Sequence, residues 1–204
     1  MFEDQFSQFA KGLPTTTPEE IAAYRRHFEI LTEWNAKMNL VSRRSFDKAF
    51  ANHYADSLFI SSFAEPFVEN RPVFDLGTGA GFPGLVFAIR NLQSKILLLD
   101  RGQKKQTFLS DAVSRLGLKN VRLENELPTK PVYGFFFARA VLPPLELFGY
   151  FSKHLKTKSR FVVNLGGKNR VDVIPAGFRR IFECSYSLPL DCGERRIEIF
   201  ECST

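Results

Sequence analysis

The strongest constraint on the fold is an alternation of short apolar runs and helical segments that begins near Pro72. Each run has the length of a buried strand and is bounded by residues typical of turns. Because parallel strands need crossover connections, this alternation predicts an α/β fold whose mostly parallel sheet is covered on both faces. The expected strands are 73–76, 96–99, 121–123, 135–138 and 161–165, and the expected helices are 84–90, 104–116 and 144–154.

The two ends of the chain depart from this alternation. Residues 17–20 (TPEE) form a capping box that predicts a helix start, and a second helix is expected from about 45 to 63, with His53 and Asp56 on one face. The segments 179–186 and 195–200 are rich in strand formers with no helix between them, which predicts an antiparallel hairpin. We therefore expect one domain over 1–204, in which a helical extension (1–70) packs on an α/β core (71–204).

A glycine-rich segment follows the first expected strand. Asp75, Gly77, Gly79 and Gly81 alternate with other residues, so that backbone without Cβ atoms lies at the carboxyl edge of the sheet. The second strand ends at Asp100, where a carboxylate can accept hydrogen bonds from both hydroxyls of a ribose. These features predict a binding site for an adenosine-containing cofactor, with Gly77, Gly79 and Asp100 in contact with it.

Two cofactors fit such a loop. Residues 79–84 (GAGFPG) satisfy the dinucleotide pattern GxGxxG, which would indicate an NAD-dependent oxidoreductase. A dinucleotide, however, places its pyrophosphate on free N–H groups of the following helix, and Pro83 lacks an N–H. Asp75, two residues before Gly77, also matches the loop of Rossmann-like (class I) methyltransferases. We therefore expect S-adenosylmethionine.

Composition narrows the setting and the partner. A net charge of +6 and a pI near 9.3 favour an anionic partner such as nucleic acid. The first residues are acidic and no apolar run approaches membrane-spanning length, so we expect a cytoplasmic protein with no membrane association. The cysteines, Cys184, Cys192 and Cys202, lack metal-ligand spacing, and no metal is expected.

A series of short motifs in a fixed order resembles one family in particular. The chain is similar to the small-subunit ribosomal RNA methyltransferase G family, also called glucose-inhibited division protein B. The resemblance spans nearly the whole chain, including Asp100. Its other motifs are residues 34–35 (WN), 38–40 (MNL), 53–58 (HYADSL), 81–84 (GFPG), 104–105 (KK), 108–109 (FL), 139–140 (RA) and 193–196 (GERR).

This resemblance implies methylation of guanosine N7 in the 16S ribosomal RNA of the small (30S) subunit. It implies cofactor contacts at Gly77, Phe82, Asp100 and Arg139, and near Asn125 and Glu126. The chain departs from the family pattern at three positions. Gly134 stands where aspartate is usual, Arg101 where serine commonly follows the acid, and Gly166 where lysine is common.

The chemistry of guanine N7 sets the expected mechanism. This nitrogen carries a lone pair and no proton at neutral pH, so methyl transfer needs no general base and none is assigned. Arg139 could orient a base edge or a phosphate, or could form only a structural salt bridge. The candidates for RNA phosphate contacts are Arg43, Arg44, Lys104, Lys105, Arg195 and Arg196.

Alternative functions remain open at this point. They are a methyltransferase for a small molecule or protein, an NAD-dependent oxidoreductase, and a non-catalytic RNA-binding assembly factor.

Overall fold

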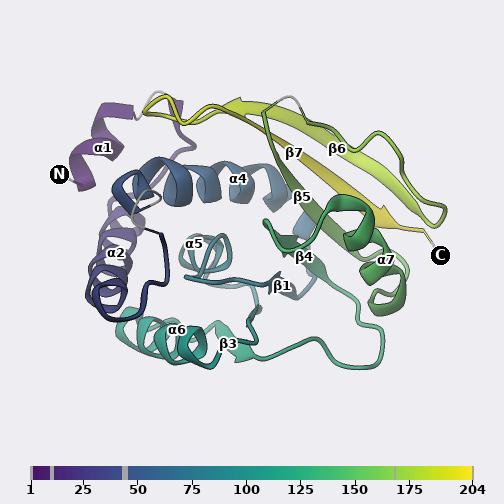
Figure 1. The fold of residues 1–204 in the computed structure, drawn as a ribbon, viewed down its shortest axis with the longest axis horizontal. Helices are drawn as coiled ribbons and strands as arrows, with labels where there is room; N and C mark the ends of the chain where they lie inside the picture. The colour runs from purple at the N-terminus through teal and green to yellow at the C-terminus, as the bar shows by residue number, and fades with distance from the viewer. Residues whose placement is uncertain (1, 10–11, 43–45, 168, 204) are drawn as a thin grey trace.

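A seven-stranded sheet forms the centre of the computed structural model, which describes residues 2–9, 12–42, 46–167 and 169–203 (Figure 1). The strand order is β3-β2-β1-β4-β5-β7-β6. The first five strands are parallel, and β7 and β6 extend the sheet in antiparallel fashion. The bounds are β1 (Val73–Leu76), β2 (Ile96–Leu99), β3 (Val121–Glu124), β4 (Phe135–Ala138), β5 (Arg160–Gly166), β6 (Phe178–Ser187) and β7 (Glu194–Cys202). The predicted mostly parallel sheet with its C-terminal hairpin is confirmed.

The N-terminal segment is helical, as predicted. It contains α1 (Phe2–Phe9), α2 (Pro18–Met38), the π-helical segment η2 (Phe50–Ala55) and α4 (Asp56–Val68). The capping box at the start of α2 is confirmed, because Thr17 Oγ1 accepts from Glu20 N at 3.2 Å and Glu20 Oε2 accepts from Thr17 N at 3.1 Å. Satisfying these two donors defines where α2 begins.

The second N-terminal helix differs from its prediction in two ways. It ends at Val68 rather than near residue 63, because Ala64 and Val68 bury further apolar surface in the core and Pro66 is accommodated inside α4. It also contains the π-helical η2, whose wider turn the apolar spacing did not indicate. The predicted start at residue 45 lies outside the described residues.

Helices cover both faces of the sheet. α5 (Gly84–Arg90) and α6 (Gln103–Leu116) join α2 and α4 on one face, and α7 (Pro144–His154) covers the other (Figure 1). Side chains along a strand alternate between faces. Phe135 and Phe137 therefore belong to the first cluster, whereas Phe136 packs with α7. Within the described ranges, every helix falls short of the length or apolarity that a membrane span requires.

Candidate active site

The glycine-rich segment turns sharply between β1 and α5. The backbone φ is +66° at Gly77, +59° at Gly79 and +87° at Gly81, a region that side-chain-bearing residues rarely adopt. A Cβ atom on Gly81 would also lie 2.4 Å from Cδ1 of Leu85. The turn therefore requires glycine and leaves bare backbone at the carboxyl edge of β1.

Most amides of this segment are bound within the protein. Gly84 N donates to Asp75 Oδ2 at 2.8 Å, and Gly79 N donates to Asp100 Oδ2 at 3.1 Å. The amides of residues 78, 81, 82 and 85 donate to backbone carbonyls. A pyrophosphate needs free amides at a helix N-terminus, and α5 begins after Pro83 with an amide that Asp75 occupies. This arrangement argues against a dinucleotide and favours a cofactor without phosphate.

Asp100 lies directly after β2 and beside the glycine turn. Its Oδ1 accepts from Gly102 N at 2.9 Å, and its Oδ2 accepts from Gly79 N and, at 3.3 Å, from Lys105 Nζ. A carboxylate has about four acceptor positions, so three are in use. Lys105 has a side chain that is 44% exposed and can turn to solvent. Its departure would leave Asp100 two positions for the two hydroxyls of a ribose.

A pocket of about 950 Å³ opens beside the glycine turn. It is lined by Gly77, Gly79 and Phe82 from the loop, Asn52 and His53 from η2, and Arg139 after β4. Pockets for small ligands measure about 300 to 1,000 Å³, so this one is large. The helical extension and the core build the pocket together.

Arg139 connects the carboxyl end of β4 to the helical extension. Its Nη1 donates to Asn52 O at 3.0 Å and to Asp56 Oδ2 at 2.9 Å, and its Nη2 lies 3.2 Å from His53 Nδ1. Because arginine offers donors alone, His53 Nδ1 accepts and the neutral ring carries its proton on Nε2. The ring of His53 stacks on that of Phe82, with centroids 4.9 Å apart. Arg139 thus forms a salt bridge and also lines the pocket.

Two histidines, the buried His27 and the half-buried His53, predict how stability changes with pH. Burial lowers the pKa of His27 from 6.5 to about 4, and burial, together with Arg139, lowers that of His53 to about 3. The unfolded chain therefore binds more protons over this range. The resulting stability is present above pH 6.5 and is lost as pH falls through 4 toward 3. Burial raises the pKa of the Asp75 carboxyl to about 6, which has the opposite sign and offsets one histidine.

We therefore expect the free energy of unfolding to rise between pH 4 and pH 6.5, by about 1.4 kcal/mol per pH unit at most. Urea unfolding across this window measures the slope. His27→Gln should flatten this pH dependence, because the contribution of the remaining His53 is then offset by that of Asp75. A slope that is unchanged in His27→Gln would contradict the assignment.

The predicted cofactor residues gather at one edge of the sheet. Gly77, Gly79, Phe82 and Arg139 line the pocket, and Asp100 lies beside Gly79. Asn125 and Glu126 follow β3 and are exposed, and Glu126 Oε2 lies 3.3 Å from Nη2 of Arg101. Their contact with the cofactor stays a prediction.

The predicted RNA-binding residues have different surroundings. Arg195 lines the pocket, whereas Arg196 pairs with Glu183 at 2.7 Å and Glu198 at 3.1 Å. Lys104 is exposed on α6, and Lys105 is paired with Asp100. Arg43 and Arg44 lie outside the described residues.

Several pocket residues had no role in the sequence analysis. They come from η2, β5, the β6–β7 turn and the segment before η2, and they are Asn52, Asn164, Asp191, Cys192 and Lys48. Of these, Asn52 adjoins the motif at residues 53–58, and Cys192 adjoins the motif at residues 193–196. The others are separated along the chain, and no spacing within the sequence links them.

The sheet order, the glycine turn after β1 and the acid after β2 define a Rossmann-like S-adenosylmethionine-dependent methyltransferase. Solved structures share this fold. A SAM-dependent methyltransferase from Aquifex aeolicus superposes with a TM-score of 0.51 and 19% identity, covering 69% of this chain and 88% of that one. A mutant of MtNAS in complex with S-adenosylmethionine has a TM-score of 0.57 at 13% identity, covering 90% and 76%.

The family is shown by sequence. The family pattern described as rRNA small subunit methyltransferase G matches residues 20–182. The ribosomal RNA small subunit methyltransferase G of Bacteroides thetaiotaomicron is 32% identical over 155 residues, which are 74% of this chain and 73% of that protein. The protein of the same name from Chlorobium luteolum is 33% identical over 163 residues, 78% and 68% of the two chains. The chain belongs to the rRNA small subunit methyltransferase G family.

Proposed function

We propose that this chain transfers a methyl group from S-adenosylmethionine to N7 of a guanosine in small-subunit ribosomal RNA, as naked RNA or in the 30S subunit. The family match over residues 20–182 carries the proposal. The start of α5 supports it against the oxidoreductase, because a pyrophosphate needs free amides there, whereas Pro83 has no N–H and the amide of Gly84 is bound by Asp75. We further propose that the whole chain acts as one domain in the cytoplasm.

The chain's own residues would bind and orient the reactants. Gly77 and Gly79 would pack against the adenosine, and Asp100 would hold the ribose. The bound cofactor supplies an electrophilic methyl group. Guanine N7 needs no deprotonation, and among the described pocket residues His53 is neutral with its Nδ1 engaged by Arg139. Catalysis then depends on alignment, which can lower a barrier by about 7 to 11 kcal/mol.

Arg195 and Arg196 offer a matched test of RNA contact. Arg195 lines the pocket, and no acidic side chain of the described residues pairs with it, whereas Arg196 is held by Glu183 and Glu198. We expect Arg195→Ala to weaken binding to small-subunit RNA and lower the salt slope by about one. Arg196→Ala should leave the slope unchanged. Equal slopes for wild type and Arg195→Ala would remove Arg195 from the phosphate contacts.

The deciding experiment maps 7-methylguanosine in ribosomal RNA from cells with and without this chain. We expect one guanosine of the small-subunit RNA to lose its methyl group when the chain is absent, and purified subunits to accept labelled methyl from the purified protein. RNA binding without transfer would favour an assembly factor. Transfer to a small molecule or protein alone would favour the other class of methyltransferase.

A further inference from the structure

We propose that Asp56 is a positioning residue, which orients Arg139 so that its guanidinium binds the methionine carboxylate of the methyl donor. The proposal rests on S-adenosylmethionine as the cofactor. It deepens the proposed function, because it assigns one end of the donor to a site built jointly by the helical extension, the core and the C-terminal hairpin.

The Asp56 carboxylate is a buried junction between distant elements. Its side chain is 5% exposed at the start of α4. Oδ2 accepts from Arg139 Nη1 at 2.9 Å, and Oδ1 accepts from Tyr186 Oη at 2.8 Å and Asn164 Nδ2 at 3.3 Å. Arg139 follows β4, Tyr186 belongs to β6 and Asn164 belongs to β5. One carboxylate therefore fixes the end of three strands relative to the extension.

This junction leaves part of Arg139 available to a ligand. A guanidinium has five N–H donors. Both donors of Nη1 are bound, to Asn52 O and Asp56, and one donor of Nη2 faces His53 Nδ1. The Nε donor and the second Nη2 donor have no acceptor among the described residues, and Arg139 lines the pocket. Two N–H groups on one planar cation suit a carboxylate.

The π-helical turn explains why these partners converge. Asn52 and His53 belong to η2, and Asp56 follows it directly. A π-turn accommodates an extra residue, and such turns are frequent at functional sites. Here it places a carbonyl, an imidazole and a carboxylate against one guanidinium. The plane of Arg139 is thereby oriented before ligand binds, so less side-chain freedom is lost on binding.

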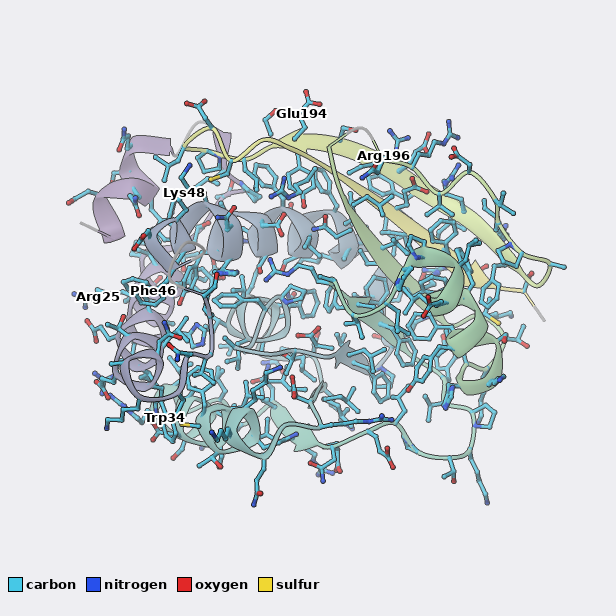
Figure 2. All side chains as sticks on the ribbon, in the orientation of Figure 1. Arg25, Trp34, Phe46, Lys48, Glu194 and Arg196 are labelled. Atoms are coloured by element: carbon cyan, nitrogen blue, oxygen red, sulfur yellow. The ribbon has the colours of Figure 1, made fainter. Side chains whose placement is uncertain are left out.

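A purely structural role for Asp56 is the competing explanation, and Glu198 provides a matched control. Glu198 is a fully buried carboxylate that accepts from Arg180 Nε at 2.7 Å and Arg196 Nε at 3.1 Å. It lies on β7, outside the pocket lining, and its partner Arg196 is labelled on the hairpin in Figure 2. Asp56→Asn and Glu198→Gln therefore each remove the charge of a buried carboxylate that is paired with arginine.

The experiment uses two ligands and the full chain. S-adenosylhomocysteine contains the amino-acid carboxylate, whereas methylthioadenosine shares the adenosine and lacks it. We expect Asp56→Asn to weaken S-adenosylhomocysteine binding by about tenfold in calorimetry and to leave methylthioadenosine binding unchanged. Glu198→Gln should leave both affinities unchanged, even if it lowers the melting temperature as much as Asp56→Asn does. Equal loss for the two ligands, or no loss in Asp56→Asn, would overturn the proposal.

A double variant tests whether Asp56 acts through Arg139. If it does, Asp56→Asn combined with Arg139→Gln should bind S-adenosylhomocysteine no more weakly than Arg139→Gln alone. Losses that multiply would show that Asp56 acts independently and would also overturn the proposal. These affinities are read without RNA, so absence of methyl transfer to the small subunit would refute the proposed substrate and leave this test intact.

Discussion

Replacing Asp100 with alanine will weaken S-adenosylhomocysteine binding by about 100-fold or more. The carboxylate would accept hydrogen bonds from the ribose hydroxyls, and each bond to a charged acceptor contributes about 1.5 to 3 kcal/mol. The same change removes the acceptor of Gly79 N and Gly102 N. Asp100→Ala would therefore remove a ligand contact and also the hydrogen bond that holds the glycine turn at Gly79.

Calorimetry with the purified protein measures this loss. Asp111→Ala serves as the control, because Asp111 is a carboxylate of α6 that accepts from Trp34 Nε1 at 2.8 Å and does not line the pocket. We expect Asp111→Ala to bind S-adenosylhomocysteine within a factor of about two of wild type, because Asp111 lies outside the pocket. An Asp100→Ala protein that binds S-adenosylhomocysteine as tightly as Asp111→Ala would refute the placement of the ribose.

Gly134→Asp, which restores the residue usual in the family, will lower the free energy of unfolding by about 3 to 5 kcal/mol. Gly134 is buried directly before β4, and a Cβ there would lie 2.5 Å from Cε2 of Phe74 and 2.9 Å from Pro72 O. Phe74 stacks on Phe136 at 4.6 Å and fills the space. Aspartate would meet this ring and place its carboxylate in a buried site.

Gly166→Lys is the matched control, since Gly166 is another departure from the family pattern. It is exposed, and a Cβ there has no described atom within 4 Å. Surface changes of this kind stay within about 0.5 kcal/mol. In thermal unfolding, we expect Gly134→Asp to melt about 6 to 20 °C lower and Gly166→Lys within about 2 °C of wild type. Equal melting temperatures would contradict the packing explanation.

The strands of the core could be predicted because each is a continuous apolar run between turn residues. Val73–Leu76, Ile96–Leu99 and Phe135–Ala138 have the expected bounds, as do the helices Gly84–Arg90 and Pro144–His154. β3 and β5 extend slightly beyond their predicted ends, since strand pairing continues into less apolar residues such as Glu124 and Gly166. The sequence placed the end of α4 too early, because the helix continues to Val68 through burial against the rest of the core.

The candidate site could likewise be predicted only in part. The glycine turn and Asp100 could be identified from the sequence, because their chemistry depends on a local turn and on the end of a strand. The surroundings of the basic residues could not. Arg195 and Arg196 are adjacent and read as one basic pair, yet neighbouring strand residues face opposite sides, so one lines the pocket and the other is bound by Glu183 and Glu198.

The α/β class, the glycine turn, the acid that follows β2 and the family could all be recognised before folding was considered, because each depends on residues close together in the chain or on their order along it. Only the packing of the folded chain brings Asp56 into contact with Arg139, 83 residues away, and Tyr186, 130 residues away. A buried carboxylate is stable where its donors converge, and that convergence arises when the extension, the core and the hairpin pack together. No periodicity along the chain encodes it.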